Sequence, residues 1–386
     1  MSDKINNIYD VEKIKYDKKL LIITIILIVA GFLAVLSASL PMCAVHKMFL
    51  LYFIIQHIFW ITLGSFGLWW FLKFDYKKLK KYTFPFAVGV IFLLLAVKFT
   101  PLGVVINGAR RWINFGIFQF QPSELAKFAL IMLLANLFSL KDKNFRVQLP
   151  KHLLTVGIMI FLVYGQPNLS MTLILLGIAL LMYICSGKSL KPLLFGILGV
   201  VSLVGINSIN ILDLSKYIKL YQWERILNWL KSTPDVQAGG YQVFHSLIAI
   251  SSGGLFGCGY GGSKEKLGWL PEAHTDFIFS VISEEFGFIG SAFIIIMFLM
   301  LFYRGIRIAL KSPTTYGKLL AFGITVSITM QAFFNISVAT SFLPATGITL
   351  PFISYGGSSL FVTMCMTGIL LNISKTVVIR VKREDN

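Results

Sequence analysis

The sequence predicts an all-α membrane protein, a polytopic bundle of about ten transmembrane helices with a large extracytoplasmic loop. Of its 386 residues, 56% are hydrophobic and only 13% are charged, a composition typical of a chain that lies largely in lipid. Several apolar stretches reach about 20 residues, the length that an α-helix needs to cross a bilayer. No internal repeat or low-complexity linker separates them, so we expect one membrane domain over residues 20–374, between tails at 1–19 and 375–386.

Apolar runs define ten expected spans. They cover residues 20–41, 49–72, 83–99, 123–140, 153–166, 169–186, 192–212, 277–303, 319–337 and 359–374. The fifth and sixth meet at Gln166-Pro167-Asn168, where a break is tolerated only inside protein or beside a water-filled cavity. The first span is too long for the apolar region of a signal peptide, so we interpret it as an uncleaved anchor.

The basic residues predict the orientation. With an even number of spans, 24 of the 35 Lys and Arg residues fall in the tails and in the loops on the same side. Loops rich in Lys and Arg stay in the cytoplasm, so we expect both termini to be cytoplasmic. The net charge of +18 therefore does not indicate a nucleic-acid partner. We expect five lysines to face anionic lipid at the membrane surface: Lys73, Lys77, Lys78, Lys80 and Lys81.

The polar motifs fall in the outer loops 100–122, 213–276 and 338–358. Asp276 stands where the chain enters a bilayer, a costly place for a carboxylate unless it has a task or a partner. It either caps the helix that follows or takes part in chemistry. His274 either orients Asp276 or caps the same helix.

Two further clusters have a structural and a functional interpretation each. Arg110, Arg111 and Trp112 either bind a pyrophosphate or extend to lipid head groups. Glu124 and Lys127 stand one turn apart in a span, as an internal ion pair or as a cation within a cavity.

Other features have simpler interpretations. Within the long loop, the residues around Trp223 and those around Phe244 recur at helical spacing, which predicts two interfacial helices. At least one of Glu284 and Glu285 should face the interior.

Gly257–Gly262 formally matches a nucleotide-binding pattern, but it lacks a preceding strand and lies outside, so we expect tight turns there and at Gly356-Gly357. The four cysteines lack metal-ligand spacing.

Three long motifs resemble the SEDS family of bacterial cell-wall polymerases. They are LPEAHTDFIFSVISEEFGFIG (270–290), GARRWINFG followed by QPSELAK (108–127) and LPATGITLPFISYGGSS (343–359). Ala273 and the run Gly347–Pro351 look more similar to the division member FtsW than to the elongation member RodA. The resemblance implies a multi-pass protein of the bacterial inner membrane, a peptidoglycan glycosyltransferase that polymerises lipid II with Asp276 as general base.

The resemblance also implies a substrate site and partners. The site would comprise Arg110, Arg111, Trp112, Glu124, Lys127, Asn168, Glu272, His274, Ser354 and Tyr355. Arg111 and Lys127, together with a divalent cation such as Mg or Mn where one binds, would stabilise the leaving pyrophosphate; no nucleotide is implied. The implied partners are lipid II, a class B penicillin-binding protein that crosslinks the strands, and other division proteins.

One position departs from the family pattern. The family usually has an acidic residue where this chain has Asn168, and that residue is thought to pair with the lysine matching Lys127. An asparagine can accept a hydrogen bond from Lys127 but cannot neutralise it. Either Glu124 takes over this task or Lys127 presents more unpaired charge to the substrate.

Three alternatives to a division polymerase stay open. They are an elongation (RodA-type) polymerase of the same family, a lipid II flippase, and a scaffold that only activates a transpeptidase. The polar motifs converge on the outer face without matching buried charges on the inner side, which favours surface chemistry over alternating access.

Overall fold

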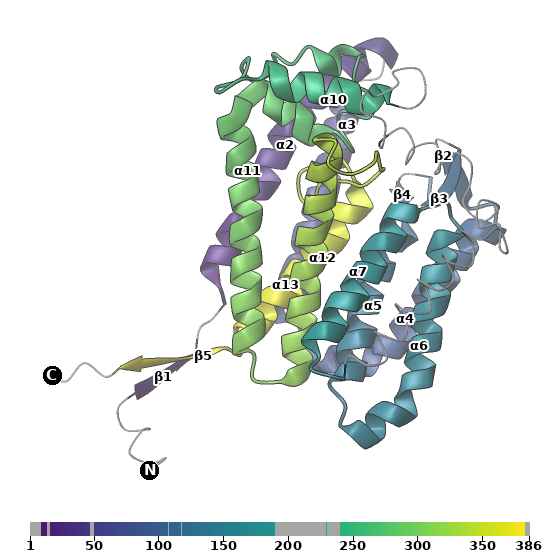
Figure 1. Cartoon of the computed structure of the whole chain (residues 1–386), viewed down its shortest axis with the longest axis vertical. Coiled ribbons are helices and arrows are strands. Elements are labelled where there is room, and N and C mark those ends of the chain that lie inside the picture. The colour runs from purple at the N-terminus through teal and green to yellow at the C-terminus, as the bar shows by residue number, and fades with distance from the viewer. Residues whose placement is uncertain are drawn as a thin grey trace, which may run out of the picture.

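The protein is an α-helical bundle whose long helices run between two ends (Figure 1). The computed structural model describes residues 9–13, 16–46, 50–106, 108–116, 118–189, 229 and 240–382. The long helices are α2 (Lys18–His46), α3 (Leu50–Lys73), α4 (Tyr76–Phe99), α5 (Pro122–Phe138), α6 (Asp142–Tyr164), α7 (Leu169–Cys185), α11 (Ile278–Lys311), α12 (Thr315–Ala339) and α13 (Gly357–Ser374). Within the described residues, seven of them are long and apolar enough to cross a membrane.

These helices confirm the polytopic fold class. Each corresponds to one of the expected spans, while the expected span 192–212 lies outside the described residues. Several helices extend beyond the apolar runs because polar residues begin them. For example, α4 starts seven residues before the expected span, where the Asp75 side chain accepts a hydrogen bond from Lys77 N at 3.0 Å.

Small residues allow the helices to approach closely. At Gly368 of α13, an added Cβ would lie 2.4 Å from the carbonyl oxygen of Leu68 in α3, so the two backbones touch. At Gly357, an added Cβ would lie 2.1 Å from the Trp60 indole. The tight turn expected at Gly356-Gly357 is therefore wrong: Gly356 is extended, with φ −164°, and Gly357 begins α13, where it makes room for Trp60.

At one end of the bundle, Asp17 joins three helices. Its carboxylate accepts from Leu20 N at 3.0 Å, which caps α2, and from Arg304 Nε of α11 at 3.0 Å. Its backbone N–H donates to Ser374 Oγ of α13 at 2.9 Å. Beyond this junction, β1 (Tyr9–Lys13) pairs antiparallel with β5 (Val378–Lys382), so both terminal segments lie at this end (Figure 1).

The opposite end carries structure that the apolar runs did not predict. There β2 (Gly103–Ile106), β3 (Ala109–Asn114) and β4 (Gln119–Phe120) form a small antiparallel sheet. The helical pattern around Phe244 is confirmed as α10 (Tyr241–Ser252). Its His245 is buried and lies 2.6 Å from Glu265 of the 3-10 helix η2 (Glu265–Leu267), so the polar side of α10 faces protein. The pattern around Trp223 lies outside the described residues.

Both Glu284 and Glu285 of α11 are buried, which confirms that expectation. Glu285 lies 2.6 Å from Lys266 Nζ, while Glu284 accepts from Ser263 Oγ at 2.5 Å. Two carboxylates near the start of α11 thus fasten the 257–267 segment to that helix. The expected tight turns are present in this segment, since Gly257, Gly259 and Gly261 have φ values of +82°, +92° and +81°.

The same segment fits a kink in α11. Gly287 has φ 63° and ψ −159°, a conformation essentially restricted to glycine. The N–H groups of Phe288 and Ile289 donate to Gly254 O at 2.9 Å and to Leu255 O at 3.3 Å. The kink therefore exchanges helical hydrogen bonds for bonds to the loop.

We expect Gly287→Ala to lower the free energy of unfolding by about 3 kcal/mol or more. A non-glycine residue in this conformation costs about 1–3 kcal/mol of backbone strain, and a steric clash adds to that cost. An added Cβ would lie 2.5 Å from Gly257 N. Gly89→Ala is the matched control, since no atom lies within 4 Å of its added Cβ. Thermal unfolding in detergent measures both variants, and equal melting temperatures would contradict this view of the kink.

A second expectation concerns orientation. The turn before Tyr76 lies at the end where the termini pair, since Tyr76 N donates to Asn372 Oδ1 at 3.1 Å near the end of α13. Lys78 is exposed beside this turn, whereas Lys264 is exposed at the opposite end. With the native cysteines replaced, Lys264→Cys should react with an impermeant reagent on whole cells, and Lys78→Cys only after permeabilisation. The reverse pattern would overturn the topology.

Candidate active site

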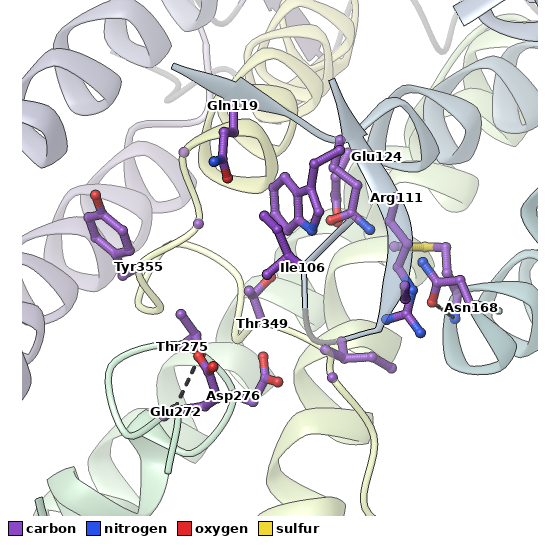
Figure 2. Close-up of a pocket in the computed structure, with 18 of the residues that line it drawn as sticks. Ile106, Arg111, Gln119, Glu124, Asn168, Glu272, Thr275, Asp276, Thr349 and Tyr355 are labelled. Carbon is purple, nitrogen blue, oxygen red and sulfur yellow. Dashed lines mark hydrogen bonds between the residues drawn. The ribbon is translucent and has the colours of Figure 1, made fainter. Parts of the chain in front are cut away.

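A cavity of about 900 Å³ lies at the end of the bundle that carries the small sheet. Its walls come from α3, β2–β4, the first turns of α5 and α7, the segment 270–277 and the loop 343–357. In Figure 2, Glu272 and Asp276 lie on one side of this space, and Arg111 and Asn168 lie on another. The volume is within the range of small-molecule binding sites, about 300–1,000 Å³.

Most of the predicted site residues meet in this cavity. Those that line it are Arg111, Trp112, Glu124, Asn168, Glu272, His274, Asp276 and Tyr355. Arg110, Lys127 and Ser354 are not among the lining residues. The fold therefore brings together side chains from segments that are far apart in the sequence.

Asp276 lies just before the N-cap position of the following helix. Helix α11 begins at Ile278 with Phe277 at the N-cap, so neither Asp276 nor His274 occupies the position that the cap interpretation requires. The Asp276 carboxylate instead points into the cavity (Figure 2). A Cβ added to Gly347 would lie 3.2 Å from Asp276 Oδ2, so the backbone of the 343–355 loop lies against this carboxylate.

A tight turn before Asp276 shapes the acidic side of the cavity. Glu272 has a positive φ of 55°, and its carbonyl accepts from the N–H groups of Thr275 and Asp276, both at 3.1 Å. Its Oε2 accepts from Thr275 Oγ1 at 2.9 Å. Ser354 Oγ donates to Thr275 O at 2.5 Å, so Ser354 joins two loops and does not contact the cavity. A non-glycine residue with positive φ is the kind of backbone strain found at functional sites.

His274 is held between rings. Its imidazole lies 5.7 Å from the Tyr355 ring and 6.4 Å from the Phe53 ring, and its carbonyl accepts from Tyr355 N at 2.9 Å. Burial lowers the pKa of His274, and the Glu272 carboxylate opposes this effect only partly. The environment of the ring therefore favours the neutral imidazole.

Several wall residues were not predicted, and Gln56 is one that carries a polar side chain. Gln56 of α3 lines the cavity, and its Oε1 accepts from the Tyr355 hydroxyl. The available signal was a carboxamide within the apolar span 49–72, because polar residues inside spans often mark a site.

Lys127 is fully buried beneath the cavity. Its Nζ lies 2.7 Å from Glu124 Oε2 and donates to Gln331 Oε1 of α12. Asn168 serves a different purpose, because its Oδ1 accepts from Met171 N at 3.3 Å and caps α7. Of the two alternatives for the departure at Asn168, the structure has Glu124 neutralising Lys127.

The two arginines differ in their contacts. Arg110 donates to two carbonyl oxygens at the end of α4, Lys98 at 3.2 Å and Thr100 at 2.5 Å, and to Gly103 O at the start of β2 at 3.0 Å. This anchors β3 at a helix C-terminus, where a cation is favoured, and it does not support substrate binding by Arg110. Arg111 is half-buried in the cavity wall, and its Nε donates to Gln166 O at 3.2 Å.

Metal ligands are sparse in the described part of the chain. No group of three or more His, Cys, Asp or Glu side chains there lies close enough together to hold a metal ion. The carboxylates of Glu272 and Asp276 are the two in the 270–277 segment of the cavity wall. Magnesium often takes only one or two protein carboxylates and completes its shell with substrate phosphates, so these residues fit a shared site of that kind.

The fold and the cavity define a multi-span membrane protein with an acidic site at one membrane face. A family model described as "Cell cycle protein" (FtsW, RodA, SpoVE) matches residues 18–378, and the chain belongs to this family. The resemblance to the SEDS family is thereby confirmed.

Named relatives cover almost the whole chain. The "Probable peptidoglycan glycosyltransferase FtsW" of Geobacter sp. (strain M18) is 39% identical over 366 residues, which cover 93% of this chain and 96% of that protein. Stage V sporulation protein E of Bacillus subtilis (strain 168) is 37% identical over 368 residues, 94% of this chain and 98% of that protein.

Solved structures share the fold. A chain of a peptidoglycan synthase complex, in a study of the structural coordination of polymerization and crosslinking, has 26% identity and a TM-score of 0.73. The match covers 93% of this chain and 97% of that chain. The rod shape determining protein RodA of Thermus thermophilus has 26% identity and a TM-score of 0.65 over 93% of this chain and 96% of that chain.

The buried ion pair gives a test by double-mutant cycle. We expect Glu124→Gln to destabilise the protein by about 3–5 kcal/mol, because it leaves Lys127 charged and buried without a counter-ion. Lys127→Met combined with Glu124→Gln should recover most of this loss, since no buried charge is left. Thermal unfolding of the two single variants and the double variant measures the coupling. Additive losses would show that the pair contributes little.

Proposed function

We propose that this protein is a peptidoglycan glycosyltransferase that polymerises lipid II during cell division. Its FtsW relatives are named as probable peptidoglycan glycosyltransferases. The observation that carries the proposal is the carboxylate of Asp276, which projects into a cavity also lined by Arg111. A base and a cation at one cavity are what sugar transfer from a pyrophosphate donor requires.

In the proposed reaction, Asp276 acts as the general base. A sugar hydroxyl of the acceptor attacks the anomeric carbon of the growing donor chain, and its proton passes to the Asp276 carboxylate. The new glycosidic C–O bond forms as the bond from that carbon to the pyrophosphate oxygen breaks, with inversion. Lipid pyrophosphate leaves with the bonding electron pair.

The leaving group develops negative charge that needs compensation. Arg111 supplies a guanidinium in the cavity wall, whereas Lys127 lies below the cavity and is neutralised by Glu124. We therefore assign direct contact with the pyrophosphate to Arg111 and a structural contribution to Lys127. Where a magnesium or manganese ion binds, Asp276 and Glu272 would hold it together with substrate oxygens, and it would add positive charge there.

The setting of this reaction is also part of the proposal. The protein would lie in the bacterial inner membrane with both termini in the cytoplasm and the cavity outside. Its partners would be a class B penicillin-binding protein and other division proteins, in keeping with a similar chain that belongs to a peptidoglycan synthase complex. The elongation role is the second candidate, because RodA of Thermus thermophilus shares the fold.

We expect Asp276→Asn to lower glycan synthesis by about two to four orders of magnitude, the usual contribution of a general base. The amide keeps the side-chain size but cannot accept the proton at ordinary pH. Gel analysis of strands made from purified lipid II measures the rate.

Asp142→Asn is the matched control, because this exposed carboxylate pairs with Lys188 far from the cavity. It should leave synthesis unchanged, and expression and lipid II binding should survive both substitutions. An Asp276→Asn protein with the wild-type rate would remove the base assignment. A wild-type protein that makes no glycan would instead favour a flippase or a scaffold.

A further inference from the structure

Two buried carboxamides lie one turn apart on α12, next to the cavity but not in its lining. Gln331 and Asn335 are each 1% exposed. Residues four apart on a helix share a face, so both side chains point toward the same loop, 343–355. Neither residue belongs to the motifs that predicted the site.

Gln331 connects the buried cation to that loop. A lysine ammonium can only donate, so the Gln331 oxygen faces Lys127 and its Nε2 faces the other way. Nε2 donates to Thr349 O at 2.9 Å and lies 3.3 Å from Ser359 Oγ. The charge of Lys127 thus fixes the orientation of an amide that holds the loop.

Asn335 connects the loop to the proposed base. Its Nδ2 donates to Asp276 O at 2.8 Å and to Ile348 O at 2.7 Å. One amide group therefore ties the backbone of Asp276 to the residue that follows Gly347, whose backbone lies against the Asp276 carboxylate. The two carbonyls accept only, which fixes the orientation of this amide as well.

We propose that Gln331 and Asn335 are positioning residues for glycosyl transfer, which together fix Asp276 relative to the Glu124–Lys127 pair. This inference rests on the proposed function. Both amides bond to the same loop, through Thr349 and Ile348, so α12 sets the spacing between the base and the charged floor of the cavity. The substrate itself would touch neither amide.

The first test is Asn335→Asp, which keeps the size of the side chain but replaces the donor with an oxygen facing two carbonyls. A misplacement of about 1 Å in an active site costs about 10²-fold in rate. We expect kcat for lipid II polymerisation to fall by about that factor, with KM and lipid II binding changed less than about threefold.

The second test is Gln331→Glu, which retains an acceptor for Lys127 but loses the donor to the loop. The same loss in kcat with little change in KM is expected. Ser327→Ala is the matched control, since Ser327 is buried one turn earlier on α12 and its hydroxyl has no hydrogen-bond partner among the described residues. It should polymerise at the wild-type rate.

The outcomes distinguish the positioning role of Gln331 and Asn335 from the proposed polymerase activity. Wild-type kcat in both amide variants would overturn the positioning role while leaving the polymerase intact. Parallel loss of kcat, lipid II binding and thermal stability would also overturn it, because that pattern indicates a structural role only. A wild-type protein that makes no glycan would overturn the proposed function itself.

Discussion

The buried charge of Lys127 is the constraint on which the site depends. Removing an ammonium from water costs several kcal/mol, and only a close counter-charge and a further acceptor offset that cost. Glu124 supplies the charge at 2.7 Å, and Gln331 of α12 supplies the acceptor. Because both partners must be present, α5 and α12 are held in one arrangement. The Glu124–Lys127 pair therefore gives the cavity a rigid base.

Hydrogen bonds from buried polar side chains also fix the loops beside the cavity. Most buried polar groups in proteins are hydrogen-bonded, and the amides of α12 bond to the carbonyls of irregular backbone beside the cavity. Asn335 joins Asp276 to Ile348, and Ser354 joins the same two segments at Thr275. Two loops without regular structure thereby hold a carboxylate in a defined place, as a catalytic base requires.

The sequence predicted the bundle well, because hydropathy reports directly which segments lie in lipid. It failed where the outcome depends on partners far away in the chain. The strands β2–β4 are short and lack an alternating pattern, so nothing marked them. Arg110 and Arg111 are adjacent and chemically identical, yet only Arg111 lines the cavity, while Arg110 bonds to the end of α4. The cap interpretation of Asp276 failed because an apolar run does not fix the first helical residue.

The central claim is that the cavity around Asp276 carries out glycosyl transfer. The most direct measurement is synthesis of glycan by the purified protein from purified lipid II, alone and with a class B penicillin-binding protein, followed together with release of undecaprenyl pyrophosphate. We expect strands and pyrophosphate to appear in step, and both to be lost when Asp276 is replaced by asparagine. Lipid II that remains unpolymerised by the wild-type protein under both conditions would contradict the account.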